Sequence, residues 1–205
     1  MHLSRIKINN FRNFADFDVS VGGNLVVVGE NRVGKSNLLH ALRLVFDPSM
    51  PDSARQLGLS DFWDGLNELT KDDSILVSVE IKEFEDDEDI LAILTDFRLD
   101  DDHQTVRLTY ELRPRADLED DPTSSEDYEF ICYGGESEAK QFGHKLRRRI
   151  TMDVLPALRD AEGDLSVWQR SPLRPLIEEA FKSVDTDSLK EISEAIEEAT
   201  AKITE

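Results

Sequence analysis

The sequence predicts an α/β domain, and three consecutive features carry that prediction. Residues 25–28 (Leu-Val-Val-Val) form a short apolar run, which is typical of a strand buried on both faces. This run leads directly into a glycine-rich segment, residues 29–36. Apolar residues then recur at helical spacing as far as Phe46, and Pro48 predicts the end of that helix. A buried strand, a glycine loop and an amphipathic helix in this order indicate a layered α/β architecture.

Two strands are predicted before the glycine segment. Alternating apolar residues indicate a strand at residues 3–8, and a second is expected at residues 17–21 after a turn at residues 11–14. The sequence Gly-Gly-Asn at residues 22–24 is a tight-turn signal. These strands are therefore expected to pair as a hairpin or meander.

Further strands and helices are predicted after the glycine segment, separated by loops at residues 48–73 and 114–127. The strands are expected at residues 75–81, 106–112 and 128–133, with a further strand or extended segment at residues 151–158, and the helices at residues 86–97 and 136–149. From residue 161 the pattern becomes helical throughout. The sequence therefore predicts a domain over residues 1–160 and a helical arm over residues 161–205.

Composition and charge restrict the protein class. Apolar residues make up 39% of the 205 residues, which is ordinary for a globular protein, and no apolar run approaches the roughly 20 residues of a membrane helix. Cys132 is the single cysteine, so no disulfide can form within the chain, and a cytoplasmic location is expected. The net charge of −20 repels nucleic-acid phosphates. We expect any contact with DNA to be made by the parent protein rather than by this acidic surface.

The pattern Gly29-x4-Gly34-Lys35-Ser36 matches the phosphate-binding P-loop. Glycines let backbone N–H groups approach a polyphosphate, and the following helix N-terminus adds positive potential. Lys35 is expected on the β- and γ-phosphates and Ser36 on magnesium, which predicts ATP and Mg²⁺ as cofactors. The alternative is a glycine turn with a solvated lysine. The residues expected to contact the nucleotide are Gly29, Glu30, Asn31, Arg32, Val33, Gly34, Lys35, Ser36 and Asn37.

Two further segments support a family resemblance. Residues 10–14 (Asn-Phe-Arg-Asn-Phe) and residues 37–43 (Asn-Leu-Leu-His-Ala-Leu-Arg) flank the P-loop in sequence. Together they resemble the RecF/SMC/ABC-type ATPases, and most of all the OLD family of ATPases fused to a Toprim nuclease, with which the Gabija A subunit of anti-phage defence is grouped. The resemblance implies a P-loop ATPase lobe of ABC/SMC type with a mixed sheet, followed by the helical arm.

The resemblance also implies roles for residues outside the P-loop. Arg12 and Asn13 would lie near the base or the phosphates of the nucleotide, although such a pair could equally cap a turn. Asp61, in a segment similar to the Q-loop region, would approach magnesium directly or through water. The alternative for Asp61 is a capping role at a helix or turn.

Several parts needed for hydrolysis in this class are not recognisable in the sequence. Residues 90–96 are apolar and end in Asp, yet their flanks indicate a helix, and residues 132–136 favour a hairpin turn over a Ser-Gly-Gly loop. No catalytic residue is therefore assigned. The resemblance implies a C-terminal ATPase lobe and a Toprim domain as partners, in the same or a separate chain. An apolar stripe of Leu189, Ile192 and Ile196 in the arm predicts a homo-oligomer, or alternatively a helical hairpin.

The sequence thus favours the ATP-binding N-terminal part of an OLD-like, ATP-regulated DNA endonuclease, with a role in anti-phage defence. One alternative is a RecF- or SMC-like DNA repair ATPase without a nuclease. Another is an assembly module that responds to nucleotide without hydrolysing it. The basic cluster Lys145, Arg147, Arg148 and Arg149 could contact DNA or a partner lobe, or could stabilise a helix C-terminus.

Overall fold

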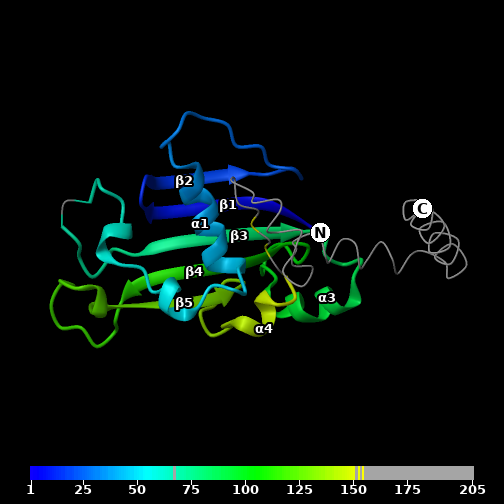
Figure 1. Ribbon diagram of the computed structural model, residues 1–205. Coiled ribbons are helices and arrows are strands. Elements are labelled where there is room, and N and C mark those ends of the chain that lie inside the picture. The colour runs from blue at the N-terminus through cyan, green and yellow to red at the C-terminus, as the bar shows by residue number, and fades with distance from the viewer. Residues whose placement is uncertain (67, 151, 153, 155–205) are drawn as a thin grey trace, which may run out of the picture. The chain divides into compact units, whose positions relative to one another are not determined.

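The computed structural model describes residues 1–66, 68–150, 152 and 154, and residues 1–152 form one compact unit (Figure 1). Its centre is a five-stranded sheet in the order β2-β1-β3-β4-β5, in which every pairing is antiparallel. The strands are β1 (His2–Phe11), β2 (Phe14–Ser20), β3 (Ile75–Lys82), β4 (Val106–Pro114) and β5 (Tyr128–Gly134). The strands predicted at residues 3–8, 17–21, 75–81, 106–112 and 128–133 are confirmed as β1 to β5. The predicted pairing of the first two strands as a hairpin is confirmed as well.

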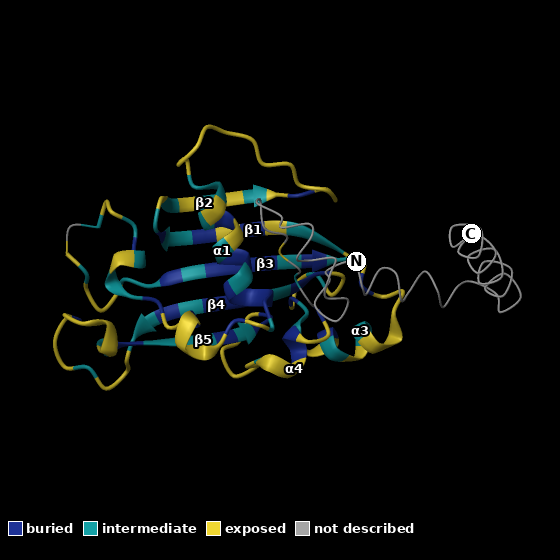
Figure 2. Cartoon of the chain, viewed as in Figure 1, coloured by how far each residue is buried: buried dark blue, intermediate teal, exposed yellow. Residues whose placement is uncertain are grey.

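One face of the sheet is apolar because alternate residues of each strand point to the same side. The register aligns Ile6 with Val79 and Val79 with Leu108, and all three side chains are fully buried. Helix α1 (Lys35–Phe46) covers this face with an apolar stripe that includes Ala41 and Val45 (Figure 2). Each fully buried Val, Leu or Ile side chain contributes roughly 1.5–3 kcal/mol to folding. This packing fixes the position of α1, and with it the end of the P-loop.

The opposite face of the sheet is polar and is held by ion pairs between neighbouring strands. Arg5 on β1 makes a two-pronged contact with Asp18 on β2, at 2.6 and 2.7 Å. Arg107 on β4 contacts Glu80 on β3 at 2.8 Å. The strict alternation of apolar and polar residues in the sequence therefore corresponds to one covered and one polar face.

Short helices fill the connections between strands. They are α2 (Asp52–Arg55), η1 (Leu59–Asp61), α3 (Glu88–Leu94), η2 (Thr95–Phe97), η3 (Ser125–Asp127) and α4 (His144–Arg147). The helical interpretation of residues 90–96 is confirmed, because they lie in α3 and η2. Asp87 caps α3 by accepting hydrogen bonds from the N–H groups of Asp89 and Ile90. Among the described residues, no helix combines the length and apolar character needed to cross a membrane.

The prediction of a strand at residues 25–28 is wrong. The run lies outside the sheet in the connection between β2 and α1, and Val26 and Val28 are 80% and 85% exposed. A strand needs a neighbour for its backbone N–H and C=O groups, and no described strand pairs with this run. The α/β class is confirmed. The mixed sheet that was expected is instead antiparallel throughout the described residues, because this buried strand does not form.

The long helix predicted at residues 136–149 is also wrong, since only α4 (His144–Arg147) is helical. The left-handed Gly135 reverses the chain after β5, at a φ of 66°. Residues 140–142 then return beside β5: Phe142 N–H donates to the Cys132 carbonyl, and Gly134 N–H to that of Lys140. Hydrogen bonds to a strand therefore replace the expected helical ones. The hairpin interpretation of residues 132–136 is confirmed.

The arm at residues 161–205 and most of the predicted strand 151–158 lie outside the described residues.

Two buried arginines bind the C-terminal end of α1. Arg55 donates to the carbonyls of Leu44, Met50 and Asp47, the first at 3.1 Å. Arg147 donates to the Val45 carbonyl at 2.9 Å and to the Cys132 sulfur. Guanidinium groups at this end donate to carbonyls that have no partner within the helix. Their positive charge also interacts favourably with the negative end of the helix dipole. Arg147 belongs to the basic cluster for which stabilisation of a helix C-terminus was one predicted role. The helix whose C-terminus it contacts is α1, and not α4, in which Arg147 itself lies.

Candidate nucleotide-binding site

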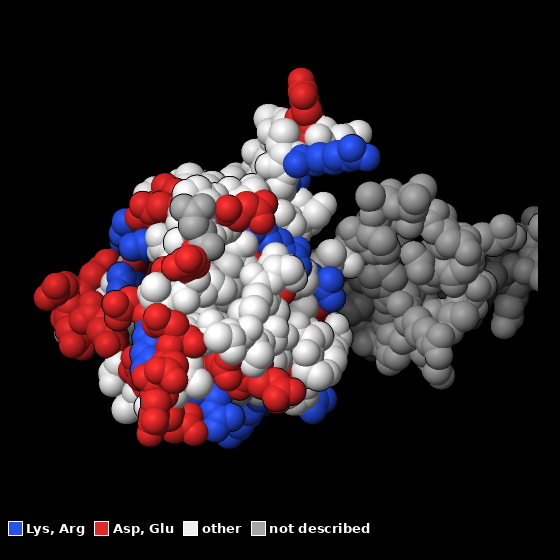
Figure 3. Space-filling model, turned by 90° about the vertical axis from the view of Figure 1, so that its left-hand side faces the viewer, with Lys and Arg blue, Asp and Glu red and all other residues white. Residues whose placement is uncertain are grey.

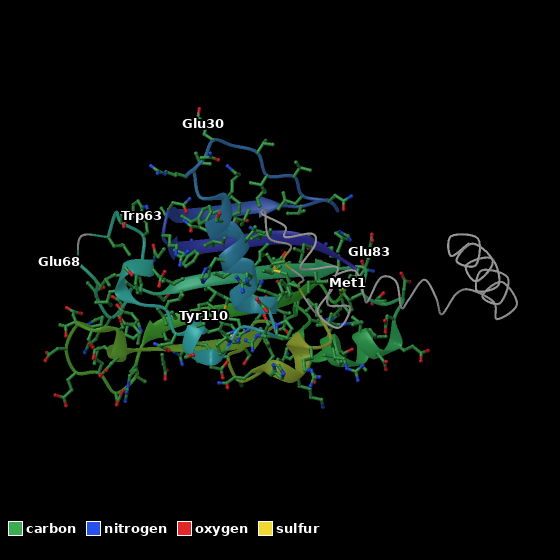
Figure 4. All side chains as sticks on the ribbon, in the orientation of Figure 1. Met1, Glu30, Trp63, Glu68, Glu83 and Tyr110 are labelled. Carbon is green, nitrogen blue, oxygen red and sulfur yellow. The ribbon has the colours of Figure 1, made fainter. Side chains whose placement is uncertain are left out.

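The P-loop connects the free run at residues 25–28 to α1 and projects beyond the edge strand β2 (Figure 1). Gly34 precedes the first residue of α1 in the left-handed conformation, with a φ of 99°. Residues 30–33 are exposed, and Glu30 lies at the outer end of the loop, pointing away from the sheet (Figure 4). The loop therefore presents its backbone at the N-terminus of α1, where an anion is favoured.

Lys35 holds its ammonium group against the loop. Its Nζ donates to the carbonyl oxygens of Gly29 at 2.7 Å and Glu30 at 2.6 Å. Ser36, the next residue, is exposed in the first turn of α1. The structure therefore brings a cation, a hydroxyl group and a helix N-terminus to one place, which is the chemistry that a magnesium-bound polyphosphate requires.

Asn13 packs directly on Gly34. A Cβ atom added to Gly34 would lie 2.2 Å from Asn13 Nδ2, a distance that no real contact allows. Asn13 Oδ1 accepts a hydrogen bond of 2.7 Å from Asn37 Nδ2. The turn between β1 and β2 is thereby attached to both the last glycine of the P-loop and the first turn of α1.

Arg12 connects the same turn to a third segment. Its Nε donates to Asp61 Oδ1 at 2.9 Å, and its Nη1 donates to Asn37 Oδ1 at 3.0 Å. Its guanidinium also lies 4.9 Å from the centre of the Phe11 ring. Arg12 adopts a left-handed φ of 50°, and its backbone N–H donates to the Asp61 carbonyl. The predicted site residues Arg12, Asn13 and Asp61 thus belong to one network beside the P-loop.

Asp61 uses both carboxylate oxygens within the protein. Oδ1 faces Arg12, and Oδ2 accepts a 3.0 Å hydrogen bond from the Gly58 N–H. The capping alternative for Asp61 is therefore seen directly, while its contact with magnesium stays a prediction. Within the described part of the chain, no three His, Cys, Asp or Glu residues gather as a metal site.

Comparison with known proteins identifies the family. A family model described as "AAA ATPase domain" matches residues 1–204. The chain belongs to this family. The predicted resemblance to OLD-type and SMC-type ATPases is confirmed by the relatives that it matches.

Two curated relatives and one solved structure are similar to this AAA ATPase domain. Endonuclease GajA of Bacillus cereus (strain VD045) is 30% identical over 95 residues, covering 46% of this chain and 16% of GajA. Chromosome partition protein Smc of Cereibacter sphaeroides (strain ATCC 17029 / ATH 2.4.9) is 41% identical over 63 residues, covering 30% of this chain and 6% of Smc. The matches thus span a small part of each relative. A structure from work on "ATP-driven dimerization and DNA stimulated activation of SMC ATPases" is 13% identical with a TM-score of 0.46, covering 86% of this chain and 96% of that one.

Asn37 and His40 of this AAA ATPase domain have contacts that sequence reasoning did not predict. Asn37 was expected only as the last residue of the motif, yet it bridges Arg12 and Asn13. His40 lies one helical turn after Ser36 and packs on Phe11, with ring centres 6.0 Å apart. The sequence did contain a signal that His40 lies near the P-loop. His40 follows Ser36 by four residues, and residues with this spacing share one face of a helix.

The Gly34→Ala substitution is expected to cost about 2–3 kcal/mol, because it combines a left-handed backbone with a collision against Asn13. The free energy of unfolding in urea, measured without nucleotide, gives the loss. Gly29→Ala is the matched control: its Cβ would meet only the movable Val33 Cγ2, at 2.9 Å. Equal losses in the two variants would contradict the role of the Asn13–Gly34 contact.

Burial lowers the pKa of His40, and the positive charges of Arg12 and Arg43 act in the same direction, while Asp61 opposes them. The unfolded chain therefore takes up this proton first as the pH falls. The resulting stability is fully present above a pH of about 6.5 and is lost below it. We expect the free energy of unfolding to fall less between pH 7.5 and 5.5 in His40→Gln than in the wild type. His103→Gln, at an exposed position, should behave as the wild type does; equal pH slopes in all three proteins would refute this.

Proposed function

We propose that this AAA ATPase domain binds ATP with magnesium through residues 29–37, as the N-terminal lobe of an OLD-like, ATP-regulated DNA endonuclease. The observation that carries the proposal is the placement of Lys35. Its ammonium group lies against the P-loop carbonyls at the start of α1, so a short movement would transfer it from Gly29 and Glu30 to phosphate oxygens.

The residues present fit this cofactor. A Cβ atom on Gly34 would collide with Asn13, so there is no room for a side chain at a position where the motif requires the backbone to approach a phosphate. The exposed Ser36 hydroxyl is the proposed magnesium ligand, with Asp61 as a second candidate. Magnesium would neutralise phosphate charge there. Arg12 and Asn13 lie next to the loop and are proposed to border the nucleotide.

A second ATPase lobe, from the same or a separate chain, is the proposed partner. The run at residues 25–28 supports it, because these apolar residues are exposed and lack a strand neighbour among the described residues. They line a hollow of about 330 Å³ together with Phe14, Phe17 and Leu38. A strand from the second lobe would cover this apolar surface and supply the missing water-activating carboxylates. A homo-oligomer through residues 161–205 stays part of the proposal.

The nuclease part of the proposal rests on the match to endonuclease GajA. The Toprim domain, the contact with DNA and a role in anti-phage defence belong to the proposed parent protein, located in the cytoplasm. Figure 3 shows carboxylates crowding the end of the molecule where the loops before β3 and between β4 and β5 lie. Such a surface repels DNA, which favours contact with DNA through another part of the protein.

The match to Smc supports a second candidate, a DNA repair or chromosome ATPase without a nuclease. A third candidate is an assembly module that binds ATP without hydrolysing it. Mass measurement with and without ATP distinguishes this module from an enzyme, provided that phosphate release is measured in parallel.

Calorimetric titration of the 205-residue chain with Mg-ATP tests the proposed function, together with an assay of phosphate release. We expect saturable binding at one site and no turnover, because the carboxylates that activate water would come from the second lobe. The absence of binding at millimolar ATP would refute the proposed function.

A further inference from the structure

Residues 58–63 are attached to the turn that borders the P-loop. The Trp63 N–H donates to the Asn10 carbonyl at 3.0 Å, and the Arg12 N–H donates to the Asp61 carbonyl at 2.8 Å. Phe62 forms an isolated bridge with Phe11, and its side chain is buried in the core. These backbone contacts hold Asp61 beside Arg12 independently of their side chains.

The side-chain contacts continue from Asp61 to the P-loop without interruption. Asp61 accepts from Arg12, Arg12 donates to Asn37, and Asn37 donates to Asn13, which packs on Gly34. The side chains of Arg12 and Asp61 are only 29% and 18% exposed. Because water is partly excluded, this charged contact is stronger than a surface ion pair and restricts the Arg12 rotamer.

We infer that Asp61 is a positioning residue, which sets nucleotide affinity by holding Arg12 and, through Asn37 and Asn13, the glycine end of the P-loop. The inference rests on the proposed ATP binding and deepens it. According to this inference, residues 58–63 influence the affinity of the P-loop for ATP. By reciprocity, a bound nucleotide must stabilise residues 58–63 by the same factor with which those residues stabilise nucleotide binding.

A positioning role and a metal-ligand role for Asp61 predict different effects of its substitution on ATP affinity. A magnesium ligand affects affinity only when magnesium is present, whereas a residue acting through Arg12 affects ATP binding with or without the ion. A residue acting through Arg12 also loses its effect once Arg12 is removed, because the two substitutions then break the same contact. These differences define the experiment.

ATP affinity of the full chain is measured by titration, with magnesium and with EDTA, for the wild type, Asp61→Asn, Arg12→Ala and the double variant. We expect Asp61→Asn to weaken ATP binding about tenfold in both conditions, and by less than about twofold in the Arg12→Ala background. Asp18→Asn is the matched control, because it breaks the similar Arg5–Asp18 pair on the polar face of the sheet and should leave affinity unchanged. Thermal unfolding checks that each variant is folded.

Three results would overturn the inference: a loss seen only with magnesium, which would make Asp61 a metal ligand, losses that multiply in the double variant, or no loss at all. Failure of the proposed function has another signature, which is the absence of binding by the wild type itself at millimolar ATP, and the inference would fall with it. Hydrogen exchange of the wild type gives a measurement that needs no variant. ATP in EDTA should slow exchange of the Trp63 N–H about tenfold, and unchanged exchange would contradict the coupling.

Discussion

The Lys35→Ala variant is expected to lose ATP binding by about 100-fold. The ammonium group of Lys35 already lies against the P-loop, where it donates to two carbonyls at 2.6 and 2.7 Å. A charged donor on a phosphate contributes about 1.5–3 kcal/mol per hydrogen bond, so the loss of one such bond corresponds to a change in affinity of about tenfold to just over 100-fold. Calorimetric titration with Mg-ATP gives the dissociation constants of both proteins.

Lys7→Ala is the matched control, because it removes the same charge from an exposed position on β1, outside the P-loop. We expect this control to bind ATP as the wild type does. Equal binding by Lys35→Ala would mean that residues 29–36 form a glycine turn with a solvated lysine. Phosphate release that depends on Lys35 would contradict the proposed need for a second lobe, and Asp61 and Asp96 would then be the first carboxylates to test.

The Arg55→Met variant is expected to lose about 4 kcal/mol of unfolding free energy. Arg55 is 2% exposed and satisfies three carbonyls around the end of α1. Methionine fills much of the same volume but donates nothing, so buried carbonyls lose their partners at about 1–3 kcal/mol each. The Tyr110 hydroxyl, which donates to the Arg55 carbonyl, remains in place. Urea unfolding followed by circular dichroism measures the loss.

Arg115→Met is the control for this variant, because Arg115 forms an exposed pair with Asp117 two residues away. Such a pair contributes less than about 1 kcal/mol. If both variants lost the same stability, the end of α1 would not depend on Arg55. Since α1 carries Lys35 and Ser36 at its other end, we also expect weaker ATP binding by Arg55→Met close to its unfolding temperature.

Local sequence signals sufficed for most of the sheet and for the P-loop. Alternation of apolar and polar residues at 75–81 and 106–112 can be satisfied only by strands with one covered face, and both strands form. Helical spacing after Ser36 similarly predicts α1, which ends before Pro48. These features depend on neighbours within a few residues, and for that reason the sequence predicts them.

Contacts between distant residues could not be obtained in this way. Asp61 meets Arg12 across 49 residues, and Arg147 reaches the Val45 carbonyl across 102 residues. No periodicity encodes such pairs, because they follow from the order of the strands and the path of the connections between them.

The sequence by itself determined the P-loop, the helix that follows it and the alternating strands, because each is a short-range pattern of glycine, charge and hydrophobicity. The tertiary structure decided that residues 25–28 remain outside the sheet and that residues 140–142 return to β5. It also decided that Asp61 holds Arg12 beside the P-loop. The physical reason is the same in each case. A backbone or carboxylate group takes the partner that the assembled fold places within hydrogen-bonding distance, and propensity at the residue itself does not specify that partner.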